Sequence, residues 1–186
     1  DPYFPKSANI YGADLVINSL HKTLPALTQT ALLHVNGDMV KRRKVKQYLD
    51  MLQTSSPSYI LMASIDACIG MLEETLETQS DARSDYKYKN IFSEYANRIE
   101  ALRKDLKRLK YLKIIQTDNT DRYDRSKFVI SVKHAPMSSH ELYEILLHRY
   151  HLQMEMLAGT YVLAMTTVGD TQEGLDRLRD ALLEID

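Results

Sequence analysis

The chain has 186 residues, of which 44% are hydrophobic and 26% are charged, and its formal net charge at pH 7 is -1. These proportions are typical of a folded globular protein and exclude a disordered chain. A net charge this close to zero creates no global field that would attract nucleic acid or an anionic membrane, so we expect neither as a partner. No apolar run reaches the roughly 18 residues that a membrane-spanning helix needs.

Cysteine use indicates the compartment. The single cysteine, Cys68, lies in an apolar helical pattern and cannot form an intramolecular disulfide, which suits a reducing environment. Residues 1–8 lack the basic and apolar regions of a signal peptide, so we expect a cytoplasmic protein. The chain does not begin with Met, which suggests that it is cut from a longer one.

The first two expected elements are strands. Residues 13–19 are almost continuously apolar or β-branched, and residues 30–35 form another apolar run that ends at the turn dipeptide Asn36-Gly37. Such uninterrupted runs are typical of strands that are buried on both faces. We therefore expect two buried strands here.

Two long helices are expected next. Apolar residues recur every three or four positions in a first segment, at Met62, Ile65, Ile69, Leu72 and Leu76. This helix should start just after Thr54-Ser55-Ser56-Pro57, with hydroxyl caps and the proline in its first turn. A second amphipathic helix is expected over residues 90–111, with one buried stripe at Ile91, Tyr95, Ile99, Leu102, Leu106 and Leu109. Its basic residues should form a solvated face: Arg103, Lys104, Lys107, Arg108, Lys110 and Lys113.

The composition turns polar over residues 117–126, which predicts a surface loop or a domain boundary. A strand is then expected over 127–132. Ser138 and Glu141 have the spacing of a capping box that opens a helix to about Tyr150. A further strand is expected over 161–168, followed by a helix to residue 185 that Asp170 or Thr171 caps. The alternation of strands and helices predicts an α/β fold.

Lys22 follows the first expected strand within the sequence Ser19-Leu20-His21-Lys22. A lysine that attacks a carbonyl must be held at a fixed point, and the end of a strand provides one. Ser19 and His21 are short polar groups that can bind a phosphate, so the turn suits a phosphate-bearing carbonyl cofactor. A three-letter pattern arises by chance roughly once in several thousand positions, and an ordinary surface lysine explains it equally well.

Other candidate ligands carry less weight. The spacing of four histidines fits neither a closed zinc site nor a helical histidine pair with a third ligand, and we expect no metal. These are His134, His140, His148 and His151. Glu155 stands between Met154 and Met156, which suggest a strand with one exposed position, so we leave Glu155 out of the site.

Longer stretches of the sequence match a known family. The segments "YGADLVINSLHKTLPALTQTALLHVNG" (11–37) and "YLDMLQTSSPSYILMASIDA" (48–67) strongly resemble the bacterial ornithine/lysine/arginine decarboxylases. The segment "LQMEMLAGTYVLAMTTVGDTQEGLDRLRDAL" (152–182) resembles the start of their smaller C-terminal domain. The resemblance covers nearly the whole chain and is weakest between residues 80 and 124.

The resemblance implies a pyridoxal 5'-phosphate enzyme of fold type I, the aspartate aminotransferase fold. Lys22 would be the Schiff-base lysine, and Ser19 and His21 would contact the cofactor phosphate. Thr54 and Ser55 would reach the cofactor phosphate of a neighbouring subunit, so the active protein would be at least a homodimer. The substrate would be arginine, lysine or ornithine, and the products the amine and carbon dioxide.

The resemblance also implies how the chain is divided. Residues 1–116 would be the C-terminal part of the large cofactor-binding domain, and residues 117–186 part of a small α/β domain, with both ends cut. The aspartate that pairs with the pyridine nitrogen would lie upstream, so we expect this chain alone to be inactive. Two alternatives stay open: another enzyme of this fold, such as an aminotransferase or aldolase, and a non-catalytic oligomerisation module.

Overall fold

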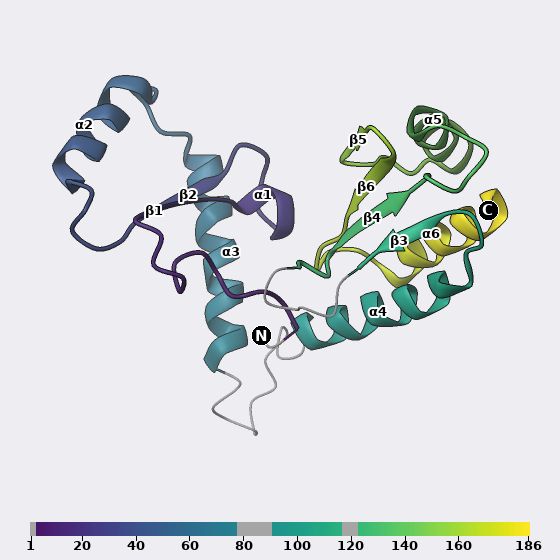
Figure 1. Ribbon diagram of the computed structural model, residues 1–186. Helices are drawn as coiled ribbons and strands as arrows, with labels where there is room; N and C mark the ends of the chain where they lie inside the picture. The colour runs from purple at the N-terminus through teal and green to yellow at the C-terminus, as the bar shows by residue number, and fades with distance from the viewer. Residues whose placement is uncertain (1–2, 78–90, 117–122) are drawn as a thin grey trace. The chain divides into compact units, whose positions relative to one another are not determined.

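The computed structural model describes residues 3–77, 91–116 and 123–186, and the chain divides into two compact units (Figure 1). The N-terminal unit is Lys6–Asn90. The C-terminal unit is Ile91–Asp186 together with Asp1–Pro5. The mixed α/β class that the sequence predicts is confirmed.

Two strands and three helices make up the described part of the N-terminal unit (Figure 1). In chain order they are β1 (Leu15–Ser19), α1 (Leu20–Thr23), β2 (Ala31–Val35), α2 (Arg42–Leu52) and α3 (Tyr59–Glu77). The strands β1 and β2 pair antiparallel, from Leu15 opposite Val35 to Ser19 opposite Ala31. Both predicted strands are confirmed as strands, and α3 confirms the first predicted long helix.

Two details of the N-terminal unit differ from the prediction. The strands are not buried, since the side chain of Ile17 is 76% exposed and those of Leu15 and Leu33 are also exposed. The sheet of this unit has two strands in the described residues, so few side chains cover its faces. Pro57 lies two residues before α3, and the hydroxyl at the helix start belongs to Ser58, whose Oγ accepts from the backbone N of Leu61 at 3.4 Å.

The C-terminal unit combines a four-stranded sheet with three helices and a short 3₁₀ turn (Figure 1). Its elements are α4 (Ile91–Asp105), the 3₁₀ turn Leu106–Arg108, β3 (Lys113–Ile115), β4 (Lys127–Ser131), α5 (Ser139–Tyr150), β5 (Met156–Ala158), β6 (Tyr161–Met165) and α6 (Gln172–Ile185). The strand order is β3-β4-β6-β5, and every pair is antiparallel. The predicted second helix therefore ends at Asp105 and not near residue 111.

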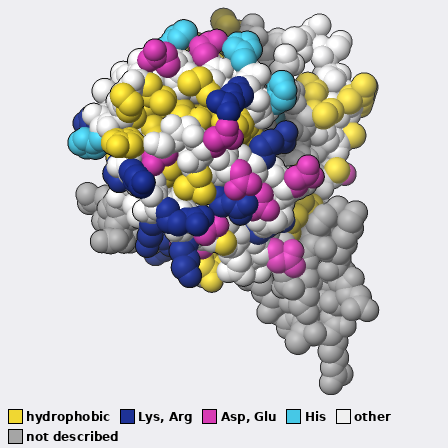
Figure 2. Space-filling model, turned by 90° about the vertical axis from the view of Figure 1, so that its right-hand side faces the viewer, with side chains coloured by type: hydrophobic (Ala, Val, Ile, Leu, Met, Phe, Trp, Pro, Cys, Tyr) yellow, Lys and Arg dark blue, Asp and Glu magenta, His cyan; other side chains and the backbone are white. Residues whose placement is uncertain are grey.

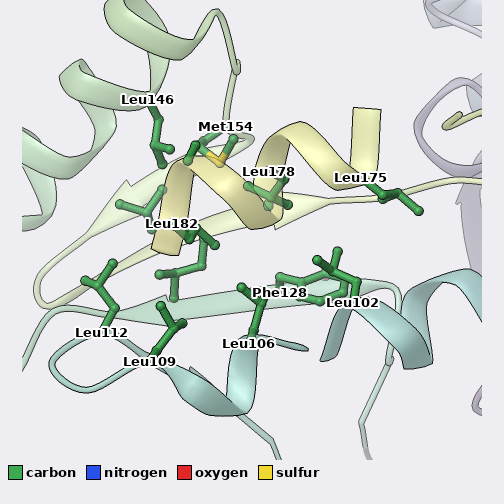
Figure 3. Packing of buried hydrophobic residues seen from close by; sticks show 14 of the residues in the cluster. Leu102, Leu106, Leu109, Leu112, Phe128, Leu146, Met154, Leu175, Leu178 and Leu182 are labelled. Atoms are coloured by element: carbon green, nitrogen blue, oxygen red, sulfur yellow. The ribbon is translucent and has the colours of Figure 1, made fainter. Parts of the chain in front are cut away.

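One face of this sheet forms the core of the unit. Phe128, Ile130, Val162 and Ala164 alternate along β4 and β6, and all four are buried. Leucines of α4, the 3₁₀ turn and α6 pack against them (Figure 3). The stripe predicted for the second long helix is confirmed at the buried residues Tyr95, Ile99, Leu102, Leu106 and Leu109, of which the last two follow α4. On α6, Leu175, Leu178 and Leu182 are buried in the same cluster.

The caps of α5 and α6 fix where these helices begin. Ser138 and Glu141 form the predicted capping box: Ser138 Oγ accepts from the Glu141 backbone N at 3.1 Å, and the Ser138 backbone N donates to Glu141 Oε2 at 2.7 Å. Of the two predicted caps of α6, Thr171 fills the role by accepting from the Gly174 backbone N at 3.1 Å. The carboxylate of Asp170 instead accepts from the Thr167 backbone N.

The basic face predicted on α4 is solvated except at Arg103. Lys104, Lys107, Arg108, Lys110 and Lys113 are exposed. Figure 2 shows basic and acidic side chains interspersed on one face of the molecule. Arg103 is buried, and hydrogen bonds replace part of its hydration: Nε and Nη2 donate to the carbonyl of Arg125, and Nη2 also donates to that of Lys127. Its guanidinium lies 4.3 Å from the ring centre of Phe128. A planar cation can be buried where carbonyls and an aromatic face replace water.

The predicted domain boundary at 116/117 stays a prediction. In this structure β3, before that position, pairs with β4, after it, and the boundary in the sequence between the two compact units falls between residues 90 and 91. Residues 117–122 of the predicted loop lie outside the described residues.

Candidate functional site

The Lys22 turn, residues 19–24, begins at the last residue of β1. Ser19 is the last residue of β1 and the N-cap of α1, and its side chain makes no cap hydrogen bond. Leu20 is buried and anchors the turn, while the backbone N of Leu24 closes it by donating to the Leu20 carbonyl at 2.9 Å. This short helix carries His21 and Lys22 at adjacent positions, with the side chain of Lys22 exposed.

His21 is held by a carbonyl from the opposite strand end. Its Nδ1 lies 2.9 Å from the Thr30 carbonyl oxygen, which also accepts from the Leu20 backbone N at 3.1 Å. Thr30 is 2% exposed and stands just before β2. The end of β1 and the start of β2 therefore support the turn together, which confirms a strand-end location for Lys22.

A second contact ties the segment after Lys22 to α3. The backbone N of Leu27 donates to Ser64 Oγ at 2.7 Å. The Thr30 hydroxyl and backbone N both donate to the Leu27 carbonyl, at 2.8 and 3.2 Å. The sequence interpretation missed Thr30 and Ser64, because both act through contacts between distant positions and no local pattern marks them.

Thr54 and Ser55 lie in the segment between α2 and α3, and both are exposed. The Thr54 hydroxyl donates to the carbonyl of Ser56 at 3.1 Å, within the same turn. The structure therefore leaves both hydroxyls accessible on the surface of this chain. Their predicted contact with another subunit's cofactor stays a prediction.

Two further features of the N-terminal unit lie apart from the Lys22 turn. Cys68 is buried in α3, and this burial raises the pKa of its thiol, so a reactive thiolate is disfavoured. A groove between β2 and α2 is lined by apolar and charged side chains. Its lining residues are Leu33, Val35, Arg42, Val45, Lys46, Leu49, Asp50 and Gln53.

Within residues 3–77, 91–116 and 123–186, no three His, Cys, Asp or Glu side chains come close enough together to hold a metal ion. Among the residues that the structure describes, every helix is too short or too polar to pass through a lipid bilayer.

Comparison with protein families gives one match that includes the Lys22 turn. The model described as "Orn/Lys/Arg decarboxylase, major domain" matches residues 6–153. Among curated proteins, the chain is 32% identical over 181 residues to the arginine decarboxylase of Bacillus subtilis, covering 97% of this chain and 36% of that protein. It is 29% identical over 189 residues to the arginine decarboxylase of Bacillus cereus, covering 97% and 38%. The chain thus spans little more than a third of these relatives.

Solved structures give the same type of fold. The lysine decarboxylase of Francisella novicida aligns with a TM-score of 0.69 at 17% identity, over 91% of this chain and 27% of that one. The constitutive lysine decarboxylase of E. coli aligns with a TM-score of 0.66 at 20% identity, over 91% and 28%. An alanine-glyoxylate aminotransferase from Nostoc aligns with a TM-score of 0.53 at 14% identity, over 97% and 50%. At these identities the likeness shows the fold alone.

Proposed function

The chain belongs to the Orn/Lys/Arg decarboxylase family, and on this premise we propose that it carries the catalytic lysine, Lys22, of a basic amino-acid decarboxylase. The observation that carries the proposal is the family match over residues 6–153, which includes the whole Lys22 turn. The geometry supports it, since a hydroxyl, an imidazole and an amine occur within one turn at a strand end. The substrate is arginine, lysine or ornithine.

The residues of the turn suit pyridoxal 5'-phosphate. Lys22 supplies an amine that can hold the cofactor's aldehyde carbon and move a proton at Nζ. The Ser19 hydroxyl makes no cap bond within the helix and can donate to a phosphate oxygen, and His21 follows it by two residues in the same turn. When bound, the cofactor supplies an electron sink for the carbanion that remains after carbon dioxide leaves. The protein's part is to orient the substrate and to return a proton.

The active protein in this proposal is a homodimer or larger. Thr54 and Ser55 of one subunit contact the cofactor phosphate held by the Lys22 turn of another. The exposure of both residues on this chain supports this role. The buried, unreactive Cys68 suits the reducing cytoplasm that we propose as the compartment.

We assign the activity to a protein of the relatives' length and not to these 186 residues alone. By this resemblance, the acidic partner of the pyridine nitrogen would lie before residue 1. Without this acid and the rest of the cofactor pocket, the chain should bind pyridoxal 5'-phosphate weakly and release no carbon dioxide.

The test is release of labelled carbon dioxide from arginine, lysine and ornithine by the full-length protein, that is, a protein as long as the related arginine decarboxylases. Lys22→Ala should abolish release, because the amine that holds the cofactor is lost. Lys41→Ala, at another exposed lysine of the same unit, should leave it unchanged. Unchanged release by Lys22→Ala would refute the assignment. Formation of a keto acid in place of the amine would instead indicate an aminotransferase.

A further inference from the structure

A continuous chain of hydrogen bonds connects α3 to the Lys22 turn. It starts at Ser64 Oγ, which accepts from the Leu27 backbone N at 2.7 Å. The Leu27 carbonyl accepts from the hydroxyl and the backbone N of Thr30, at 2.8 and 3.2 Å. The Thr30 carbonyl in turn accepts from the Leu20 backbone N and from His21 Nδ1, at 3.1 and 2.9 Å. Thr30 therefore takes part in both the hydrogen bonds to Leu27 and the hydrogen bonds to the Lys22 turn.

The contact with Thr30 determines which ring nitrogen of His21 carries a proton. A carbonyl oxygen can only accept a hydrogen bond, so Nδ1 must be the donor. A neutral imidazole has one N–H, and with that proton on Nδ1 the other nitrogen, Nε2, presents a lone pair. Nε2 is therefore the ring atom that remains to meet a ligand.

This tautomer has a consequence for binding a phosphate. Phosphate oxygens at neutral pH act mainly as acceptors, so a hydrogen bond from Nε2 requires a second proton on the ring. The imidazolium that results donates from both nitrogens, to the Thr30 carbonyl and to the phosphate. Such charge-assisted bonds are shorter and roughly twice as strong as neutral ones. Within two residues of His21 in the sequence, the only charged side chain is that of Lys22.

The local backbone shows why Thr30 can hold this position. Gln29 has a φ of 80°, in the left-handed region that residues with a side chain rarely adopt. Directly after it, Thr30 is 2% exposed and makes two hydrogen bonds to one carbonyl with its backbone N and hydroxyl. Unusual backbone conformations persist where surrounding contacts enforce them, and they concentrate at functional sites.

We propose that Thr30 is a positioning residue: its carbonyl holds His21 in the Nδ1–H tautomer, so that Nε2 meets the phosphate of the cofactor, as a donor only in the imidazolium form. The cofactor part of this inference rests on the proposed function. The positioning part rests on hydrogen bonds within the chain itself.

The first test measures the tautomer of His21 by long-range proton-nitrogen NMR correlation in the 186-residue chain, with ¹⁵N-labelled histidine and the His21→Gln variant for assignment. The expected result is the Nδ1–H tautomer. Thr30→Val should give a mixture of tautomers, because the hydroxyl bond to Leu27 is lost, whereas Thr30→Ser should keep the native signals. An Nε2–H tautomer in the unchanged chain, or an unaltered tautomer in folded Thr30→Val, would overturn the proposal.

If Thr30→Val fails to fold, Ser64→Ala provides the same test from the other end of the chain of bonds. Removing the acceptor of the Leu27 N–H should also shift His21 toward a mixture of tautomers. An unaltered tautomer in Ser64→Ala would then overturn the proposal.

The second test uses the full-length protein and compares binding of pyridoxal 5'-phosphate with that of pyridoxal, which lacks the phosphate. Thr30→Val should reduce the preference for the phosphate form about tenfold, and Thr30→Ser should restore it. An unchanged preference in Thr30→Val would overturn the role toward the phosphate. If the tautomer is as expected but the unchanged protein binds neither compound, the proposed function fails and the positioning of His21 stands.

Discussion

The two units differ in how much apolar surface they bury. In the C-terminal unit, one continuous cluster of buried side chains joins the sheet to α4, α5 and α6 (Figure 3). In the described part of the N-terminal unit, the buried apolar residues are Leu20, Cys68 and Met71, while Ile17 and Tyr59 are largely exposed. The candidate site lies in this second, sparsely packed unit. Burial should therefore make the C-terminal unit the more stable one, while the N-terminal unit carries the proposed chemistry.

The difference has a simple physical origin. In β4 and β6, alternate residues face the helices, so each strand contributes a row of side chains to one buried layer. The ladder of β1 and β2 has the same antiparallel pairing, but none of its residues is buried, and of its apolar residues only Val16, Leu32 and Val35 are half-buried. A two-stranded sheet is marginally stable in water without additional cover.

The largest expected effect on stability comes from the core of the C-terminal unit. Phe128→Ala should destabilise the chain by about 3–5 kcal/mol, because it leaves a cavity where a ring with 0% exposure is packed. Ile17→Ala, at a 76% exposed strand position of the other unit, should cost less than about 0.5 kcal/mol. Urea unfolding curves of both variants measure the free energies. Equal losses of unfolding free energy in the two variants would contradict the expected difference between the units.

A smaller loss is expected at the buried arginine. Arg103→Met should cost about 2–3 kcal/mol, because the carbonyls of Arg125 and Lys127 lose their charged donor inside the unit. Lys104→Met, at the exposed neighbouring position, should change stability by less than about 0.5 kcal/mol. Thermal unfolding of the pair measures the difference. Similar melting temperatures would mean that Arg103 behaves as a surface residue after all.

Asp186 makes the stability of the C-terminal unit depend on pH. Partial burial favours the neutral carboxyl, but hydrogen bonds from the backbone N of Lys110, Tyr111 and Leu112 outweigh it and lower the pKa of Asp186 below its ordinary 3.8. A carboxyl with a lowered folded-state pKa stabilises the fold above its unfolded pKa, and this stability is lost as the pH falls through the folded value. Unfolding free energy should therefore decline below about pH 4.

Asp186→Asn tests this source of pH dependence. At pH 7 the variant should be less stable by about 1–2 kcal/mol, since an amide oxygen accepts more weakly than a carboxylate. As the pH falls through the lowered folded-state pKa of Asp186, the variant and the unchanged chain should converge, because both then have a neutral side chain. A constant difference across this pH range, measured by urea unfolding, would contradict the proposed cause.

The smallest effects compare one helix cap in each unit. Ser138→Ala should cost about 1 kcal/mol, because it removes the capping box of α5. Ser58→Ala should cost less, since Ser58 Oγ accepts from the Leu61 N–H at a longer 3.4 Å and is exposed. Urea unfolding measures both values. A larger loss for Ser58→Ala would reverse the expected order.

Local patterns predicted the helices of the C-terminal unit well and the contacts of single residues poorly. The stripe of α4 and the capping box at Ser138 follow from spacing alone, because helix period and cap geometry are local properties. The short strand β3 was not predicted, since three residues are too few to show a period. The helix α2 was also missed, although Val45, Tyr48, Leu49 and Leu52 have helical spacing.

The candidate site was predicted in part. The sequence placed Ser19, His21 and Lys22 at the end of a strand, and the structure has them there. It gave no indication of the roles of Thr30 and Ser64, because their partners lie 9 and 37 residues away in the sequence. The burial of Arg103 was missed for the same reason, since its acceptors lie on another element.

The most direct test of the central claim, that the chemistry belongs to Lys22 of the N-terminal unit, is borohydride trapping of pyridoxal 5'-phosphate followed by peptide mapping. In the full-length protein, one cofactor per chain should be covalently attached to the peptide that contains Lys22. The isolated 186-residue chain should show no such stoichiometric labelling at micromolar cofactor. Labelling of a lysine in the C-terminal unit, such as Lys127 or Lys133, or labelling spread over many lysines of the longer protein, would contradict the account.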